Sequence, residues 1–221
     1  MAIEDKLDEL TNGEIDVVGR LVNASNASLY CRVGEVFAIY KPIAGERPLW
    51  DFPDGHLAWR EVATYKVSEA LGLNCVPTTI LREGPFGTGS LQLWIDEVED
   101  VEERYLEKSD GLRKIALLDA VVNNTDRKVG HLLYKNGEIF GCDHGVTFHE
   151  EFKLRTVLWQ FADMALNQNE IQALSSFNLD LAPLLTEREQ QALQERIANL
   201  LQINRFPLPP TDWPAIPWPP F

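Results

Sequence analysis

The spacing of hydrophobic and polar positions in the first half of the chain predicts a series of short elements. Residues 1–13 are typical of a short acidic helix. Residues 13–42 carry β-branched and aromatic residues in strand-length runs between turn-forming residues, which predicts three strands in a meander. Apolar positions three or four residues apart predict a helix over 57–71, ended by Gly72. Two further strands are expected within 77–96.

The second half of the chain has helical periodicity around one predicted hairpin. An apolar run, KIALLDAVV, predicts the end of a helix, and the polar loop after it leads to a hairpin with its turn at Asn136-Gly137. Residues 148–177 and 184–202 are both predicted to be helical. Thr186 and Glu189 form the capping-box pattern at the start of the second of these helices.

Composition limits the classes of protein that fit. A chain of 221 residues with 45% hydrophobic content can bury its core as one domain or as two small lobes. We find no run of eighteen apolar residues and no basic-then-apolar leader, so we expect a protein that is neither exported nor membrane-spanning. Three distant cysteines without C-x-x-C spacing favour a reducing cytoplasm. A formal charge of −14 argues against nucleic acid partners and stable membrane association.

Four charged residues are candidates for chemistry. Asp126 and Asp143 lie on loops that flank the predicted hairpin, which suits a hard cation such as Mg²⁺. Acidic turn residues without a ligand are the alternative interpretation. Lys41 ends a strand on its apolar face and therefore needs an anionic partner. Glu61, in the predicted helix, is the partner available to it.

A zinc site with nitrogen ligands is a competing hypothesis, because His131, His144 and His149 are close to Asp143 in sequence. The spacing of His144 and His149 does not place both on one helical face, and the chain has no H-E-x-x-H motif. The sequence therefore favours an oxygen-ligated cation over zinc.

Several segments resemble a known family. NTDRKVGHLLY and IFGCDHGVTF resemble the catalytic and metal-binding loops of phosphatidylinositol 3-/4-kinase-type enzymes, especially type II phosphatidylinositol 4-kinases and their bacterial relatives. YKPIAGERPLWDFPDG, REVA, LGLNCVP and LQLWID resemble an uncharacterised, mainly actinobacterial family described as phosphatidylinositol 3-/4-kinase-like. The resemblance covers about residues 17–150. It implies a two-lobed, protein-kinase-like α+β fold with a strand-rich lobe over 1–94, a helical lobe over 95–206 and a proline-rich tail over 207–221.

The resemblance implies a role for each candidate residue. Asp126 would orient or deprotonate the acceptor hydroxyl, and Asp143 would bind Mg²⁺. Lys41 would contact the α- and β-phosphates of ATP, with Glu61 orienting it. His131 stands where the family usually has a metal-binding Asn. Three consequences are open: the second metal is lost, His131 contacts phosphate, or the protein prefers Mn²⁺.

Two further segments are expected to bind ATP if the resemblance holds. The loop between the first two strands offers Ser25, Asn26 and Ser28 to the phosphates, although it lacks the usual glycines and also fits a plain hairpin turn. Trp94 and Ile95 lie where the family has its adenine-binding hinge, and packing in the core is their alternative role. Arg47, on the long loop after the third strand, is placed near the phosphates or the acceptor.

The function expected from the sequence is ATP-dependent transfer of a phosphoryl group to a hydroxyl acceptor, with Mg²⁺ or Mn²⁺ as cofactor. A protein or a small soluble molecule is the preferred acceptor, because the chain has no polybasic run or basic amphipathic helix. The alternatives are a nucleotide-binding pseudokinase, a phosphoinositide kinase proper and transfer of the AMP portion of ATP. The tail is predicted to be extended polyproline II, either bound by a partner protein or docked on the chain's own surface.

Overall fold

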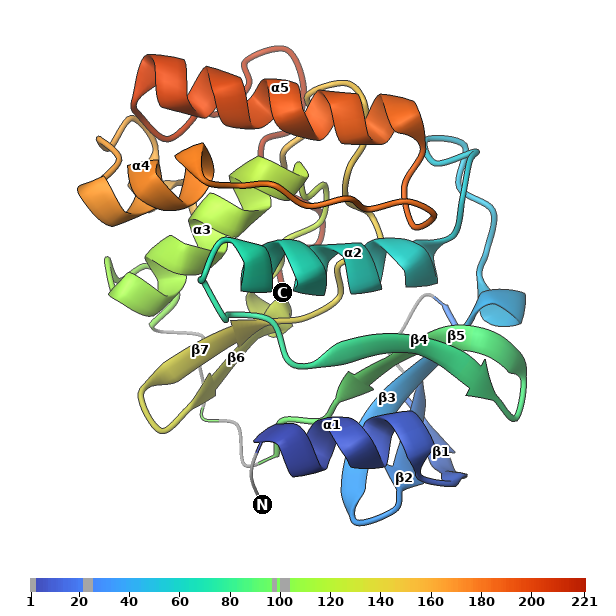
Figure 1. Ribbon diagram of the computed structural model, residues 1–221. Helices are drawn as coiled ribbons and strands as arrows, with labels where there is room; N and C mark the ends of the chain where they lie inside the picture. Colours follow the sequence, from blue (N-terminus) through green and yellow to red (C-terminus); the bar gives the residue numbers. More distant parts are fainter. Residues whose placement is uncertain (1–2, 22–25, 97–98, 100–103) are drawn as a thin grey trace.

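A computed structural model describes residues 3–21, 26–96, 99 and 104–221 (Figure 1). Its first part is a five-stranded antiparallel sheet with strand order β1-β2-β3-β5-β4, and a short N-terminal helix packs against β3 and β4. The predicted first helix, three-strand meander and later strand pair are confirmed. The elements of this part are α1 (Ile3–Asn12), β1 (Ile15–Arg20), β2 (Leu29–Val33), β3 (Val36–Pro42), η1 (Ile43–Gly45), β4 (Thr79–Gly84) and β5 (Gly87–Leu93).

Strand β3 separates the core of the sheet from the cleft beneath it. Ala38 and Tyr40 are fully buried in a hydrophobic cluster that also contains Leu10 of α1. Because side chains alternate along a strand, Lys41 projects from the opposite face, as does Ile39. The polar end of β3 is thereby directed away from the small core and toward the helical part of the molecule.

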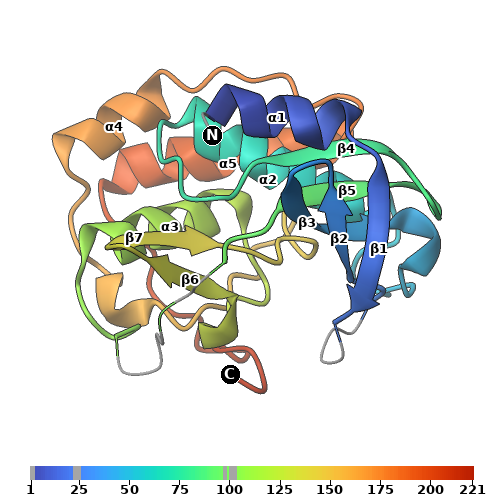
Figure 2. The ribbon, with the colours of Figure 1, turned by 90° about the horizontal axis from the view of Figure 1, so that it is seen from below.

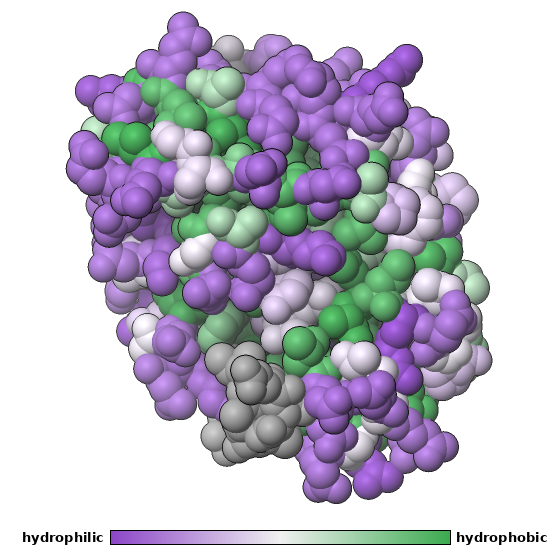
Figure 3. All heavy atoms as spheres, in the orientation of Figure 1, coloured by the Kyte–Doolittle hydropathy of each residue, from purple (hydrophilic) through white to green (hydrophobic). Residues whose placement is uncertain are grey.

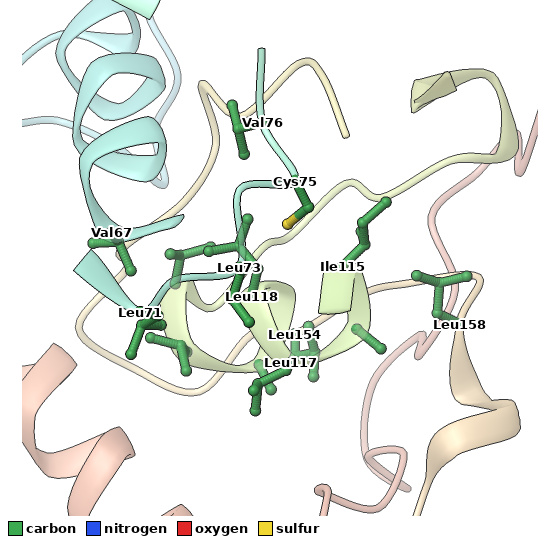
Figure 4. Packing of buried hydrophobic residues seen from close by; sticks show 14 of the residues in the cluster. Val67, Leu71, Leu73, Cys75, Val76, Ile115, Leu117, Leu118, Leu154 and Leu158 are labelled. Atoms are coloured by element: carbon green, nitrogen blue, oxygen red, sulfur yellow. The ribbon is translucent and has the colours of Figure 1, made fainter. Parts of the chain in front are cut away.

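Helix α2 (Leu57–Ala70) lies between the sheet and the other helices (Figure 1). It ends as predicted, with Gly72 in the left-handed region at φ 65°. Its buried residues Ala63 and Val67 belong to the larger hydrophobic cluster, in which they pack with residues of the helical part (Figure 4). A buried ion pair between Arg60 and Glu189 also joins α2 to the last helix. These contacts fix the helix that carries Glu61.

The second part of the molecule consists of helices and one small hairpin. The hairpin turn has Asn136 at φ 52° and Gly137 at φ 83°, the left-handed pair that a two-residue turn requires, so this prediction is confirmed. Thr186 and Glu189 form the predicted capping box. The elements are α3 (Asp110–Val122), η2 (Val129–His131), β6 (Leu132–Lys135), β7 (Glu138–Gly141), η3 (Trp159–Phe161), α4 (Gln168–Ser175) and α5 (Glu187–Ile203).

The predicted helix over 148–177 is wrong for most of its length. Only α4 and the short η3 are helical within it. The backbone of residues 155–157 instead pairs with the loop that carries Asp126: the Arg155 N–H donates to Asn124 O (2.9 Å), and the Val157 N–H donates to Arg127 O (3.2 Å). The apolar residues of this segment are spaced as in a helix, but the segment is irregular. The reason is that its backbone groups form hydrogen bonds with residues distant in the sequence instead of with one another.

The surface is strongly polar, in agreement with the charge of the chain. Hydrophilic residues dominate the face shown in Figure 3, and hydrophobic patches lie between them. Among the helices that the structure describes, none has the length and apolar character needed to cross a membrane. Residues 207–221 form no helix or strand and run along the helical part, where the chain ends beside β6 and η2 (Figure 2).

Candidate functional site

Lys41 is the centre of a cluster of charges at the end of β3. Its Nζ donates to Glu61 Oε1 at 2.5 Å and to Asp143 Oδ1 at 2.7 Å. Burial opposes a charge on this ammonium group, but the two carboxylates outweigh burial and raise the pKa of Lys41 above its ordinary value. Lys41 is therefore a permanent cation that joins an acid of α2 to an acid of the second part of the chain.

Glu61 connects three segments of the site. Its side chain is almost completely buried, so both carboxylate oxygens need partners. One oxygen binds Lys41, and the other accepts the backbone N–H of His144 at 2.9 Å. Because α2 is fixed in the core, Glu61 holds the lysine of the sheet against the loop that follows β7.

Asp143 follows the hairpin and adopts a left-handed backbone conformation, φ 59°. One oxygen pairs with Lys41, and the other lies 3.3 Å from His131 Nε2. Lys41 is the main reason that the pKa of Asp143 is held well below its ordinary value, and His131 contributes to the same shift. Asp143 is nevertheless open to solvent, with 52% of its side chain exposed. An ionised, accessible carboxylate of this kind fits a hard cation.

His131 lies beside Asp143. Its Nδ1 accepts the backbone N–H of Lys128 at 3.5 Å, so in the neutral ring the proton belongs on Nε2, which faces Asp143. Burial lowers the pKa of His131 to about 4, and the ring is therefore neutral near pH 7. In this tautomer the ring offers Asp143 a donor. The predicted role of His131 as a metal ligand stays a prediction.

Asp126 lies on the loop after α3 and lines the same cavity as Asp143. Its backbone N–H donates to Asn124 Oδ1 at 3.0 Å, and its Oδ2 is 3.1 Å from Lys128 Nζ. Burial raises the pKa of Asp126, and Lys128 opposes this effect. The sequence analysis did not single out Lys128. A lysine two positions after a candidate catalytic aspartate, on the same loop, was the available signal.

Arg127 holds the loops of the site together and was also missed. Its guanidinium binds both oxygens of Asp119, donates to the carbonyls of His131 and Cys142, and contacts His144 Nε2. Arg127 and Asp119 are both 0% exposed. The signal in the sequence was an acid, Asp119, within an otherwise apolar helix, because a buried acid needs a cationic partner.

A cavity of about 300 Å³ brings the candidate residues together. This volume is at the lower end of the range for small-molecule sites. Four carboxylates and two cationic side chains line it, a formal charge of −2. The lining residues are Asn26, Ala27, Ser28, Lys41, Pro42, Glu46, Arg47, Leu49, Leu57, Ala58, Glu61, Asp126, Asp143, Gly145 and Val146.

The predicted phosphate loop reaches this cavity. Asn26 and Ser28 line it, and Asn26 Oδ1 accepts the backbone N–H of Arg47 at 3.0 Å. This bond joins the loop to the segment that follows β3, and Arg47 lines the cavity as well. Ser25, the third residue predicted for this role, lies outside the described residues.

The two residues predicted for the purine pocket lie outside the lining of this cavity. Trp94 follows β5 and packs edge-on against Tyr30, with the ring centroids 5.1 Å apart. Tyr30 stacks in turn on Phe37, which shares the face of β3 that carries Lys41. Trp94 thus lies near the end of β3 opposite to Lys41, and contact of Trp94 and Ile95 with a purine stays a prediction.

The donor set of the site fits a cation that completes its coordination with phosphate and water. Within the described part of the chain, no three His, Cys, Asp or Glu side chains form a group that could hold a metal ion. Asp143 supplies one accessible carboxylate. Mg²⁺ is commonly bound through one or two carboxylates together with substrate phosphates, so this site suits a cation that arrives with its nucleotide.

Solved kinases have the same fold. The Golgi casein kinase superposes with a TM-score of 0.60 over 91% of this chain and 74% of that chain, at 13% identity. Its structure with Mn/ADP bound gives the same TM-score at 14% identity over 91% and 75%. The Helicobacter pylori proinflammatory kinase CtkA gives 0.53 at 13% identity, over 88% and 94%. The chain therefore has a mixed α/β, kinase-like fold, as the sequence predicted.

The sequence comparisons give one weak and one strong relationship. No protein-family model matches the chain. Phosphatidylinositol 4-kinase gamma 4 of Oryza sativa subsp. japonica is 29% identical in an alignment that covers 68% of this chain and 31% of that protein. Protein Rv2133c of Mycobacterium tuberculosis is 37% identical over 99% of this chain and 96% of its own length. The chain belongs to the family of Protein Rv2133c.

Proposed function

We propose that this chain is an ATP-dependent phosphotransferase that uses Mg²⁺ or Mn²⁺ and transfers a phosphoryl group to a hydroxyl acceptor. The observation that carries the proposal is the contact of Lys41 with both Glu61 and Asp143, on a cavity that Asp126 also lines. The kinase names of the proteins with the same fold support it, as does the Mn/ADP complex of the Golgi casein kinase.

Electrostatics of the cavity support a metal-dependent nucleotide. A lining with a formal charge of −2 repels a free triphosphate, so nucleotide binding needs an added cation. Asp143 would hold that cation, and the cation would neutralise part of the negative charge of the phosphates. Lys41 and the loop with Asn26 and Ser28 would contact the phosphates, and Glu61 would keep Lys41 in place. Trp94 and Ile95 are proposed to flank the purine.

Asp126 is proposed to bind the acceptor hydroxyl. Burial raises the pKa of this carboxyl, which makes the carboxylate a better proton acceptor than an exposed aspartate. Lys128, at 3.1 Å, favours the ionised form of the group. In a loose phosphoryl-transfer transition state little base strength is needed, so the main contribution of Asp126 is to orient the hydroxyl.

A soluble hydroxyl compound, either a protein or a small molecule, is the acceptor class that we propose. The net charge of −14 disfavours approach to an anionic membrane surface. One observation favours a phosphoinositide instead: the match to a phosphatidylinositol 4-kinase of Oryza sativa subsp. japonica. In this rival hypothesis, the chain would be related specifically to type II phosphatidylinositol 4-kinases.

A second candidate function is nucleotide binding without phosphoryl transfer. His131 in place of a metal-binding Asn favours it, because the ring turns a donor toward Asp143 and its lone pair toward the Lys128 backbone. A site that binds only one cation would retain the nucleotide without transferring its phosphate.

Labelled ATP distinguishes these functions. The protein is incubated with γ-labelled or α-labelled ATP, Mg²⁺ or Mn²⁺, and separate protein, lipid and small-molecule fractions of a cell extract, with Lys41→Met as the control. We expect γ-label in the protein or small-molecule fraction and none with the control. Label in the lipid fraction would favour the phosphoinositide kinase, and α-label would indicate nucleotidyl transfer. ATP binding without transfer would support the regulatory protein, and absence of binding would refute both functions.

A further inference from the structure

The C-terminal tail contacts the loop that carries the candidate catalytic residues. The carbonyl of Pro220 accepts the backbone N–H of Val129 at 2.9 Å. Val129 begins η2, between Asp126 and His131, and its own side chain is buried. A carbonyl of the tail thus holds the backbone between the proposed acceptor-binding Asp126 and His131, which lies beside Asp143. Figure 2 shows the C-terminal end of the chain near β6.

A second contact of the tail reaches the same loop through Thr156. The carbonyl of Ala215 accepts the backbone N–H of Thr156 at 3.1 Å and the indole N–H of Trp159 at 2.8 Å. Thr156 forms a parallel bridge with Arg127, and its hydroxyl donates to Asp119 at 3.3 Å. Thr156 therefore connects the tail to the buried network of Arg127 and Asp119, which joins the loops of the site.

Two aromatic side chains and a proline fasten the tail. The guanidinium of Arg155 lies 5.2 Å from the centroid of the Trp213 ring, a cation–π geometry. Phe221 contacts the Tyr105 ring edge-on at 6.3 Å, and Pro217 is buried. By contrast, 90% of Trp218 is exposed. The tail thus docks on its own chain, which was one of the two alternatives left open by the sequence.

We propose that residues 213–221 position the catalytic loop for phosphoryl transfer. The claim that the tail speeds transfer rests on the proposed function. The claim that the tail orders the loop rests on the hydrogen bonds alone. Without Pro220 and Ala215, the amides of Val129 and Thr156 would have to be satisfied by water, and the loop would sample more conformations. Displacement of a catalytic group by about 1 Å can slow a reaction by about 10²-fold. The tail would affect turnover more than nucleotide binding, because Lys41 lies in β3 and Asn26 in the loop between β1 and β2.

Removal of the last three residues tests the proposal. A form that ends at Trp218 lacks the Pro220 carbonyl and the Phe221 ring. Two full-length variants are matched controls: Pro220→Ala keeps a carbonyl at the contact, and Ile216→Ala changes a half-exposed side chain of the same tail. ATP hydrolysis gives kcat, calorimetry with ATP and Mn²⁺ gives Kd, and NMR gives the exchange rates of the Val129 and Thr156 amides.

We expect the shortened form to lose about 10- to 100-fold in kcat, to keep its Kd within about twofold, and to exchange the Val129 amide faster. Both controls should behave as the full-length protein. Unchanged kcat in the shortened form would overturn the proposal, and so would parallel losses of kcat and nucleotide affinity, which indicate general destabilisation. If the full-length protein neither binds nor hydrolyses ATP, the proposed function fails by itself. The exchange rate of the Val129 amide then tests whether the tail orders the loop, and an unchanged rate in the shortened form refutes that claim.

Discussion

Two clusters of charged side chains meet at His144 in this molecule and differ in how completely their charges are balanced. In the first, Arg127 and Asp119 are 0% exposed and neutralise one another. In the second, Lys41 faces two carboxylates, Glu61 and Asp143, and the latter has 52% of its side chain exposed. The first cluster is closed and neutral, whereas the second is open and carries one excess negative charge.

This difference separates structural from chemical roles. The neighbours of Arg127 are carbonyl oxygens and the ring of His144, whose pKa is lowered well below its ordinary value by burial and by Arg127 itself. No charge is left there for a ligand to neutralise. Around Lys41 the excess carboxylate charge is directed into a cavity of about 300 Å³. Removal of a charge from the first cluster should therefore lower the free energy of unfolding. Removal of a charge from the second should impair ligand binding.

The largest expected effect on folding comes from Arg127→Met, which leaves Asp119 buried without its cationic partner. Loss of one member of a buried ion pair costs about 3–5 kcal/mol. We expect a reduction of this size in the free energy of unfolding, measured by urea denaturation. A loss below about 1 kcal/mol would contradict the structural role assigned to Arg127, because it would match an exposed pair.

Asp126→Asn should slow transfer by about 10²- to 10⁴-fold, the usual contribution of a positioned acid–base group. Nucleotide affinity and the free energy of unfolding should change little, because Asp126 is held by Lys128 at the edge of the cavity. The γ-labelled ATP assay gives the rate, and calorimetry gives the affinity. Loss of nucleotide binding in this variant, with retention in Asp143→Asn, would show that the two roles are reversed.

Asp143→Asn should abolish most of the metal-dependent stabilisation by nucleotide. A ligand at a hundred times its Kd stabilises a protein by about 2.7 kcal/mol. Thermal unfolding with ATP, with and without Mg²⁺ or Mn²⁺, should show this gain for the parent protein and little of it for the variant. Without ligands, the variant should melt close to the parent, since Lys41 retains Glu61. An equal gain in both proteins would remove Asp143 from the metal site.

The smallest effect is expected at an exposed ion pair of the sheet. Arg32 lies 2.8 Å from Asp16, and the two side chains are 58% and 56% exposed. Solvent screens such a pair, so Arg32→Met should change the free energy of unfolding by less than about 1 kcal/mol. This variant is the matched control for Arg127→Met, and a cost as large as that of Arg127→Met would show that burial does not explain the difference between them.

The sequence by itself determined the elements with strong local signals. The turn at Asn136-Gly137 requires two left-handed residues, and few residue pairs allow that. Thr186 and Glu189 satisfy the first amides of α5 from within one turn. The order of strands and helices and the kinase-like fold were also predictable, because each depends on short segments with a specific pattern. The same holds for five of the six charged residues that line the cavity: Lys41, Arg47, Glu61, Asp126 and Asp143.

Only the tertiary structure decided where long-range hydrogen bonds replace local ones. Residues 155–157 have helical periodicity but pair with the loop around Asp126, since their backbone groups find distant partners there. The buried pairing of Arg127 with Asp119 and the contact of Pro220 with Val129 have the same origin. The sequence shows that a charge or an amide will need a partner if it is buried. Only the folded structure determines which distant group is that partner.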